Sequence, residues 1–450
     1  MHSPAHASWP SAFPRSFHKQ YPRAVRGEGA WLYDEHGKQY LDLAGSAAVS
    51  FLGHGDPEIA RAIAAQLSEL EFAHSSQFAT AVAEDFAREL LAFAGPAFGG
   101  GAVFFTSGGS EAVETALKLA RQYQVESGHD ERCQVISRRQ SYHGATLGAM
   151  AVSGNLRRRQ PYLPMLREFG HINTPYCYRC AYGGNNCAAS YAGELERAIG
   201  EAEGKAAAFI CEPISGATLG AVAPPDGYLQ EVRRICDAHG LLWIADEVMT
   251  GCGRTGRNFA CEHWQVAPDI MVAGKGLAAG YAPLGAVIAS HDVVEAIARG
   301  SGSLIHGFTF NAHPVSVSAG RAVLRRIGEL GLVKAADGGN PGSLAAEFAV
   351  ALQTLRDCDR VGDVRGLGLL WGVEFVADRQ TKAPLDPSAG FAVRIFDAAQ
   401  RRGVLVYPMQ GSVDGVRGDH LLLAPPAVTT RAEIYRGISE LRHAIREAHP

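Results

Sequence analysis

The sequence predicts an α/β protein built on a mostly parallel sheet with helices on both faces. From about residue 100, short apolar runs alternate with amphipathic helical stretches such as Glu111 to Glu126 and Gly227 to Ala238. The runs are apolar throughout, and this is typical of strands that are buried on both faces and separated by helices. Six runs predict strands: AVFFTS, CQVIS, AAAFICE, LLWIADE, DIMVAGK and GAVIAS.

The two ends of the chain predict a second, smaller α+β unit. The stretch AWLYDEHGKQYLDL alternates apolar and polar residues around a His-Gly turn, which favours a hairpin. The last third begins with helices, continues with LLWGVEFV, GVLVYP and HLLLAPP, and closes with a helix from Thr430. We expect a flexible N-terminus (1–20), the N-terminal part of a small domain (21–65), a large domain (66–315) and the C-terminal part of the small domain (316–450).

Composition narrows the class of protein. The chain is 47% hydrophobic with a net charge of -4, and its basic residues are dispersed apart from Arg157 to Arg159. We therefore expect neither nucleic acid nor a membrane as partner. The first twenty residues lack the apolar core of a signal peptide. Nine scattered cysteines favour reduced thiols, so we expect a cytoplasmic protein.

Polar side chains follow several of the predicted strands. Ligands of doubly wound sheets bind beyond the carboxyl ends of the strands, so residues at these positions are the first to inspect. Because the ends of parallel strands meet at one edge of a sheet, we expect these side chains to form a single site. They are Thr106, Ser107, Glu212, Asp246, Glu247 and Lys275.

Two of these strand ends suit a charged ligand. Gly108, Gly109 and Ser110 lead directly into a helix, whose free backbone amides bind anions such as phosphate. Ser110 could instead simply cap the helix. Asp246 ends a very apolar strand, where an ionised acid is costly unless a cation meets it. An isolated Asp-Glu pair such as Asp246 and Glu247 is more often a cap or loop former than catalytic.

Lys275 is the third unusual strand end. It is one of only seven lysines and stands between two glycines after an apolar run. Burial lowers the pKa of a lysine, and the neutral amine can attack a carbonyl to form a Schiff base. The alternative is a lysine whose stem packs on the strand while its ammonium reaches water.

Taken together, the motifs of this chain resemble those of the class III aminotransferases, pyridoxal phosphate enzymes of fold type I. The similarity runs in order over about residues 20 to 445. The resemblance implies that residues 66–315 bind pyridoxal phosphate and that the enzyme is a homodimer with active sites at its interface. The matching residues are Ser107 to Ala112, Tyr142 to Gly144, Glu212-Pro213, Asp246 to Val248, Gly253 to Gly256, Lys275-Gly276 and His306 to Thr309.

The resemblance also implies roles for single residues. Lys275 would form the internal aldimine with the cofactor and later move the proton between the substrate carbon and the cofactor. Asp246 would pair with the pyridine nitrogen and keep it protonated. Thr309 would reach the phosphate of the neighbouring subunit. The other expected cofactor-binding residues are Gly109 and Ser110 at the phosphate, Tyr142 and Val248 on the two ring faces, and His143 and Glu212 beside the ring.

Departures from the family pattern bear on the substrate. Members that use glutamate commonly have an acid where this chain has Ala217 and a glutamine where it has Met249. Both changes resemble the branch that acts on ω-amines or ω-amino acids with pyruvate as acceptor more than the 4-aminobutyrate or ornithine branch. Alternatives are a 2-oxoglutarate-using ω-aminotransferase, an aminomutase, a racemase or a decarboxylating transaminase, because the cofactor supplies the steps that these share. A protein that binds the cofactor without catalysis is a further alternative.

Three residues are expected at the substrate. In the resembling branch a mobile arginine binds the substrate carboxylate, and Arg417 in GVRGDHLLLAPP matches its place, although a solvated loop arginine beside Asp414 is an equal alternative. Tyr142 would face the substrate as well as the cofactor. Related enzymes often carry a Leu-Trp pair where Ala47 and Ala48 stand here, so we expect a roomy pocket that accepts bulky amines.

An insertion rich in cysteine and tyrosine remains. His171, Cys177, Cys180 and Cys187 are four possible zinc ligands in HINTPYCYRCAYGGNNCAAS, but Cys187 lacks a closely spaced second ligand. We therefore expect no metal here, and a loop that contacts the substrate or the dimer partner.

Overall fold

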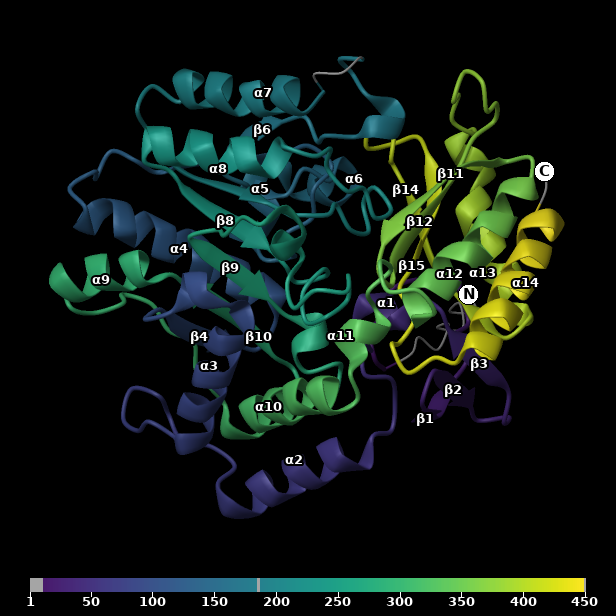
Figure 1. Ribbon diagram of the computed structural model, residues 1–450, viewed down its shortest axis with the longest axis horizontal. Helices are drawn as coiled ribbons and strands as arrows, with labels where there is room; N and C mark the ends of the chain where they lie inside the picture. The colour runs from purple at the N-terminus through teal and green to yellow at the C-terminus, as the bar shows by residue number, and fades with distance from the viewer. Residues whose placement is uncertain (1–10, 184–186, 449–450) are drawn as a thin grey trace, which may run out of the picture.

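The computed structural model describes residues 11–183 and 187–448, and its largest sheet has seven strands in the order β4-β10-β9-β8-β7-β5-β6 (Figure 1). Strand β10 runs antiparallel to both of its neighbours, and the other neighbouring strands pair in parallel. The predicted mostly parallel sheet is confirmed. Its strands are β4 (Ala102–Thr106), β5 (Gln134–Arg138), β6 (Gly170–Ile172), β7 (Ala206–Cys211), β8 (Leu242–Asp246), β9 (Ile270–Ala273) and β10 (Gly285–Ala289).

Helices cover both faces of this sheet because its central strands are apolar on both sides. In β8, Ile244 points into a core shared with α4 (Gly109–Glu126), while Trp243 packs with α7 (Cys187–Glu201) and α8 (Tyr228–His239). Near β4 and β10, the cover comes from α3 (Ala81–Ala94) and α10 (Pro314–Glu329). All six apolar runs of the central region form strands, as predicted.

Two smaller sheets form the rest of the molecule, at the right of Figure 1. One has the order β11-β12-β15-β14 and the other β1-β2-β3-β13. The predicted N-terminal hairpin is present as β2 and β3, and β3 also pairs in parallel with β13 near the other end of the chain. The strands are β1 (Ala24–Glu28), β2 (Trp31–Asp34), β3 (Gln39–Asp42), β11 (Val361–Leu367), β12 (Leu370–Phe375), β13 (Val404–Leu405), β14 (Tyr407–Gln410) and β15 (Asp419–Leu423).

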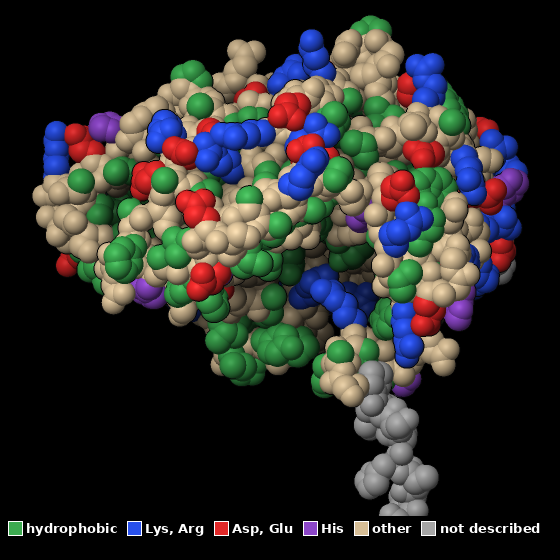
Figure 2. All heavy atoms as spheres, turned by 90° about the horizontal axis from the view of Figure 1, so that it is seen from below, with side chains coloured by type: hydrophobic (Ala, Val, Ile, Leu, Met, Phe, Trp, Pro, Cys, Tyr) green, Lys and Arg blue, Asp and Glu red, His purple; other side chains and the backbone are tan. Residues whose placement is uncertain are grey.

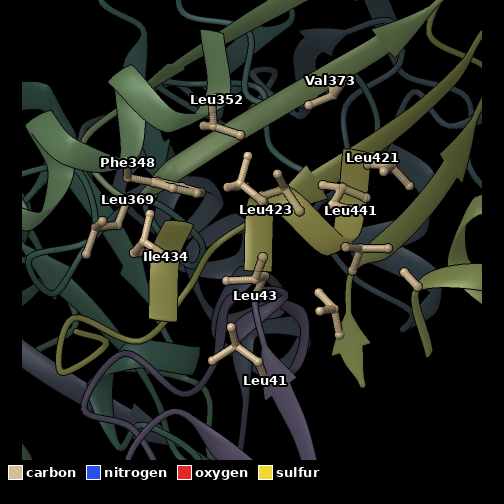
Figure 3. Packing of buried hydrophobic residues seen from close by; sticks show 14 of the residues in the cluster. Leu41, Leu43, Phe348, Leu352, Leu369, Val373, Leu421, Leu423, Ile434 and Leu441 are labelled. Carbon is tan, nitrogen blue, oxygen red and sulfur yellow. The ribbon is translucent and has the colours of Figure 1, made fainter. Parts of the chain in front are cut away.

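A single core joins these two sheets to their helices. Leu41 from β3 and Leu421 and Leu423 from β15 meet helices α12 (Leu344–Gln353), α13 (Phe391–Arg401) and α14 (Arg431–Glu447) in one apolar cluster (Figure 3). Helix α14 begins after Thr430, whose side chain and that of Glu433 each accept a hydrogen bond from the other's backbone N–H. The closing helix predicted from Thr430 is confirmed.

In the described part of the chain, six further helices lie between the elements described so far. They are α1 (Gly45–Ala48), α2 (Pro57–Glu69), α5 (Leu147–Val152), α6 (Leu156–Arg159), α9 (His291–Arg299) and α11 (Leu332–Ala335). The domain boundaries predicted at 65/66 and 315/316 fall inside α2 and α10, and the division at these points stays a prediction. Residues 1–10 of the flexible N-terminus expected over 1–20 lie outside the described residues.

The molecule has two parts, the large sheet with its helices and the two smaller sheets with theirs. Seen from below, a hollow lies between these parts, and basic side chains lie in it (Figure 2). In the described ranges, no helix is both long and apolar enough to cross a membrane.

Candidate active site

The carboxyl edge of the large sheet carries the predicted site. Glu212 follows β7, Asp246 ends β8 and Lys275 follows β9 after one glycine. These strands are parallel neighbours, so their ends meet at one edge, as expected. A cavity of about 200 Å³ opens there and brings together eight of the predicted residues. Its lining is Gly109, Ser110, Tyr142, His143, Gly144, Glu212, Ile214, Ala217, Asp246, Val248, Met249 and Lys275.

Asp246 is a fixed, buried acceptor at the floor of this cavity. Its Oδ2 lies 2.7 Å from Nδ1 of His143, and both side chains are almost completely buried. Its Oδ1 accepts the backbone N–H of Val248 at 3.1 Å. With both oxygens held, the carboxylate has one orientation, and it presents negative charge to the cavity.

Lys275 lies at the end of β9 in an uncommon backbone conformation. Its φ is 43°, in the left-handed region that a side chain with a Cβ rarely adopts. Burial lowers the pKa of Lys275 and the charges of Asp246 and Glu212 act in the opposite direction. A lower pKa increases the fraction of neutral amine, which is the nucleophilic form.

Glu212 is an acid with unused hydrogen-bonding capacity. Its Oε1 accepts the backbone N–H of Gly216 at 3.2 Å, and its Oε2 is buried with no hydrogen-bond partner among the described residues. Burial raises the pKa of Glu212, and the charge of Asp246 raises it further. The carboxyl group of Glu212 is therefore harder to ionise than that of an exposed glutamate.

The start of α4 closes the other end of the cavity. Gly109 is the first residue of the helix, and a Cβ at this position would lie 3.1 Å from a methyl carbon of Val248. Ser110 accepts the backbone N–H of Ala145 on its Oγ at 3.0 Å. Its hydroxyl therefore joins the helix start to the loop after Tyr142. The first backbone N–H groups of α4 have no acceptor within the helix, and such groups can bind an anion.

Three other predicted residues lie outside the cavity lining. Thr309 is exposed in the loop before α10. Arg417 is exposed and its Nε lies 2.6 Å from Oδ2 of Asp414, the solvated arrangement that was the alternative for this residue. Ala48 is buried in an apolar cluster against which Ala217 and Met249 of the lining pack, and it does not itself line the cavity.

The cysteine-rich insertion shows no metal geometry. Among residues 11–183 and 187–448, no group of three or more possible ligands is placed to hold a metal ion. The ring nitrogens of His171 lie within hydrogen-bonding distance of the carbonyl oxygens of Phe169 and Ser153. The sulfur atoms of Cys180 and Cys187 lie 3.1 Å apart, and all nine cysteines are free.

Comparison with known proteins places this geometry in a family. The family model of the class III aminotransferases matches residues 13–445. The chain belongs to this family. An uncharacterised aminotransferase of Bacillus subtilis, YodT, is 39% identical over 93% of this chain and 94% of its own. An omega-aminotransferase of Caulobacter vibrioides is 33% identical over 98% and 97%.

Solved structures agree with the assignment. A transaminase from the marine bacterium Virgibacillus superposes with a TM-score of 0.90 at 30% identity, over 97% of both chains. An amine transaminase from an uncultivated Pseudomonas species, solved with pyridoxal phosphate bound, gives a TM-score of 0.89 at 34% identity and covers 98% of this chain and 99% of its own. This aminotransferase therefore has the fold type I architecture that the resemblance implied.

Sequence reasoning missed two residues that support the site. Nε2 of His420 in β15 lies 2.7 Å from the carbonyl oxygen of Ala217. This contact ties the loop after Glu212 to the β11-β12-β15-β14 sheet. Arg254 is buried and donates to the carbonyl oxygens of Ala424 and Pro425 at 3.0 and 2.6 Å. Its position in the Gly253 to Gly256 motif was a signal, but which carbonyls it meets depends on the packing of the two parts.

Proposed function

We propose that this aminotransferase moves an amino group from an ω-amino acid or amine to a keto acid, most favourably pyruvate. The observation that carries the proposal is the meeting of Lys275, Asp246 and the start of α4 in one cavity. Pyridoxal phosphate, the cofactor expected from the family, supplies an electron sink for the carbanion when it is bound.

The lining has the chemistry that this cofactor needs. The Asp246 and His143 pair offers a negative acceptor suited to a protonated pyridine nitrogen, and the free Oε2 of Glu212 offers a polar partner beside the ring. Gly109 and Ser110 would bind the phosphate at the helix start. Tyr142 and Val248 line the cavity and would enclose the ring between them.

Lys275 would carry the covalent and proton-transfer chemistry. Its lowered pKa favours the neutral amine, which is the form that would bond covalently to the aldehyde carbon of the cofactor. Nζ of Lys275 would also serve as the base that takes the proton from the substrate carbon that bears nitrogen. Asp246, held by His143 and Val248, would keep the ring nitrogen protonated during this step.

Ala217 and Met249 support the choice of acceptor. Both line the cavity, where Ala217 replaces the acid and Met249 the glutamine that glutamate-using members commonly carry. The Caulobacter relative is named an omega-aminotransferase, and a relative from Solanum lycopersicum, 33% identical over 94% of this chain and 80% of its own, is named gamma aminobutyrate transaminase 3. An ω-amino donor agrees with both names.

A homodimer would complete the site. Thr309 is exposed beside Phe310, which is itself 56% exposed, and Ile305 in the same loop is 78% exposed. Large apolar side chains so open to water favour an interface. A second copy packed on this loop would bring Thr309 to the neighbouring phosphate. The cytoplasmic location stays a prediction from the cysteines.

Borohydride reduction followed by mass spectrometry tests the role of Lys275. After incubation with pyridoxal phosphate, the unaltered protein should gain one cofactor per chain, attached at Lys275. Lys275→Ala should gain none there and should produce no alanine from an amine and pyruvate. Lys205→Ala is the matched control, because Lys205 is exposed and outside the cavity, and it should behave as the unaltered protein. Cofactor fixed elsewhere, or activity of Lys275→Ala, would contradict the proposal.

The reaction type and the acceptor have separate tests. Incubated with amine and no keto acid, a transaminase stops after one equivalent of product, whereas an aminomutase or racemase continues. With keto acid present, alanine from pyruvate should exceed glutamate from 2-oxoglutarate. Dominant glutamate formation would show that Ala217 and Met249 do not select the acceptor.

A further inference from the structure

The short helix α6 carries three consecutive arginines whose environments differ. Arg157 donates from Nη1 to Oε1 of Gln410 at 2.6 Å at the surface. Arg159 is partly buried, and burial lowers its pKa. Arg158, between them, is partly buried, and its guanidinium carbon lies 4.6 Å from the centre of the Tyr142 ring. Only Arg158 therefore reaches a residue that lines the active-site cavity.

Arg158 has a stacking partner but no counter-ion. Among the described residues it forms no ion pair with a carboxylate within 4.0 Å. Its five donors are therefore free for a ligand, while the face of the guanidinium rests on an aromatic ring. A partly buried guanidinium in this state favours binding of an anion, and carboxylates match the geometry of its donors.

The charge of Arg158 also acts on the reacting amine. It is among the groups that lower the pKa of Lys275, after burial and against the opposing carboxylates. The guanidinium of Arg158 therefore lies within electrostatic range of the Lys275 amine.

The alternative arginine is already engaged. Arg417 pairs with Asp414 through Nε and also donates its backbone N–H to Oδ1 of the same residue at 2.7 Å. Its loop lies beside α6, since a Cβ on Gly415 would come within 2.9 Å of Leu156 Cδ1. Binding a substrate through Arg417 would require breaking that ion pair, whereas Arg158 needs no such change.

We propose that Arg158 binds the carboxylate of the substrate and thereby selects donors that carry a carboxylate remote from the reacting amine. This inference rests on the proposed transaminase function and names its substrate class. It assigns to Arg158 the part that the family resemblance gave to Arg417.

A matched pair of donors tests the proposal, with 4-aminobutyrate against butylamine and pyruvate as acceptor. Arg158→Met keeps most of the side-chain volume over Tyr142 and removes the charge. The ratio of kcat/KM for 4-aminobutyrate to that for butylamine should fall roughly 10- to 100-fold, as expected for a lost charge-assisted hydrogen bond. The fall should lie mainly in KM, and Arg158→Lys should restore part of it.

Two variants serve as controls. Arg157→Met removes the neighbouring charge from the same helix and should leave the ratio unchanged. Arg417→Met should also leave it unchanged. An equal loss for both donors in Arg158→Met would overturn the proposal in favour of a structural role, and a selective loss in Arg417→Met would return the carboxylate to Arg417.

Carboxylate binding can also be measured without turnover. Titration of the unaltered protein with butyrate, followed by calorimetry, should show binding that weakens roughly 10-fold or more in Arg158→Met and not in Arg157→Met. If no amine reacts with the unaltered protein, the proposed function fails while this measurement still decides the role of Arg158. Equal butyrate affinity in all three proteins would overturn it.

Discussion

His420 should make the stability of this protein depend on pH in a way that one substitution removes. The ring is completely buried in β15, and its Nε2 lies 2.7 Å from the carbonyl oxygen of Ala217. Burial, with a smaller contribution from the charge of Arg365, lowers the pKa of His420 to about 4, from 6.5 when it is exposed. Neutral His420 donates from Nε2 to the carbonyl oxygen of Ala217, and burial outweighs this hydrogen bond, so the folded state resists protonation.

The direction and size follow from the two pKa values. Between about pH 6.5 and pH 4 the unfolded chain binds a proton at His420 that the folded chain does not, so the free energy of unfolding falls as the pH falls. For these values the loss between pH 7 and pH 5 is about 2 kcal/mol. Below about pH 4 the contribution reaches its limit and stays constant.

The assay is urea unfolding of the cofactor-free protein at pH 7 and pH 5 and at one protein concentration, because ligands and subunit association shift apparent stability. His420→Gln keeps an N–H donor for Ala217 but does not titrate. The drop in stability from pH 7 to pH 5 should be about 2 kcal/mol smaller in His420→Gln than in the unaltered protein. Equal drops in both proteins would refute the reasoning.

Two other substitutions or treatments have defined outcomes. Glu374 is fully buried in β12 and pairs with Arg179 at 2.7 Å and with Arg365 at 2.9 Å. Glu374→Ala leaves these arginines without their partner, so the free energy of unfolding, measured in urea, should fall by about 3 kcal/mol or more. An unchanged unfolding midpoint would show that the two pairs contribute nothing to stability. Diamide, a thiol oxidant, should join Cys180 to Cys187 because their sulfurs lie 3.1 Å apart; mass spectrometry of peptides should find this pair, and Cys180→Ser should abolish it. A different pairing would contradict that geometry.

Much of the fold could be predicted because the central strands are apolar on both faces. A short run in which every residue is apolar, such as the one ending at Asp246, predicts a strand that is buried on both faces. Strand β6 escaped prediction because it has only three residues and one of them is glycine. The reversed direction of β10 was also hidden, since an apolar run has the same pattern whichever way the strand points.

The site could be predicted where a residue follows a strand. The ends of β7, β8 and β9 gave Glu212, Asp246 and Lys275 directly, and the cavity brings them together. Partners from other parts of the chain could not be predicted in the same way. The contact of His420 with Ala217 depends on how the β15 sheet packs against the large sheet, and a buried histidine carries no periodic pattern of its own.

Arg417 illustrates the limit of motif matching. Its neighbourhood in the sequence suggested a carboxylate-binding arginine, but the structure pairs it with Asp414, three residues earlier. Arg158 stood out only as part of the basic run Arg157 to Arg159, and a run of arginines is usually a solvated surface. The direction in which each of the three side chains points was decided by the start of α6 after Asn155, whose side chain accepts the backbone N–H of Arg158.

The parallel pairing of β3 with β13 limits the order in which the chain can fold during synthesis. Leu41 emerges from the ribosome early, yet its partner Val404 is made about 360 residues later. At 5 to 20 residues per second, synthesis of that interval takes on the order of tens of seconds. The large sheet can assemble during this time. Leu41 and Leu43, which are synthesised first, stay exposed to solvent until α14 has been made and packs on them. A chain truncated before α14 would keep that apolar surface open and become a target for chaperones and aggregation.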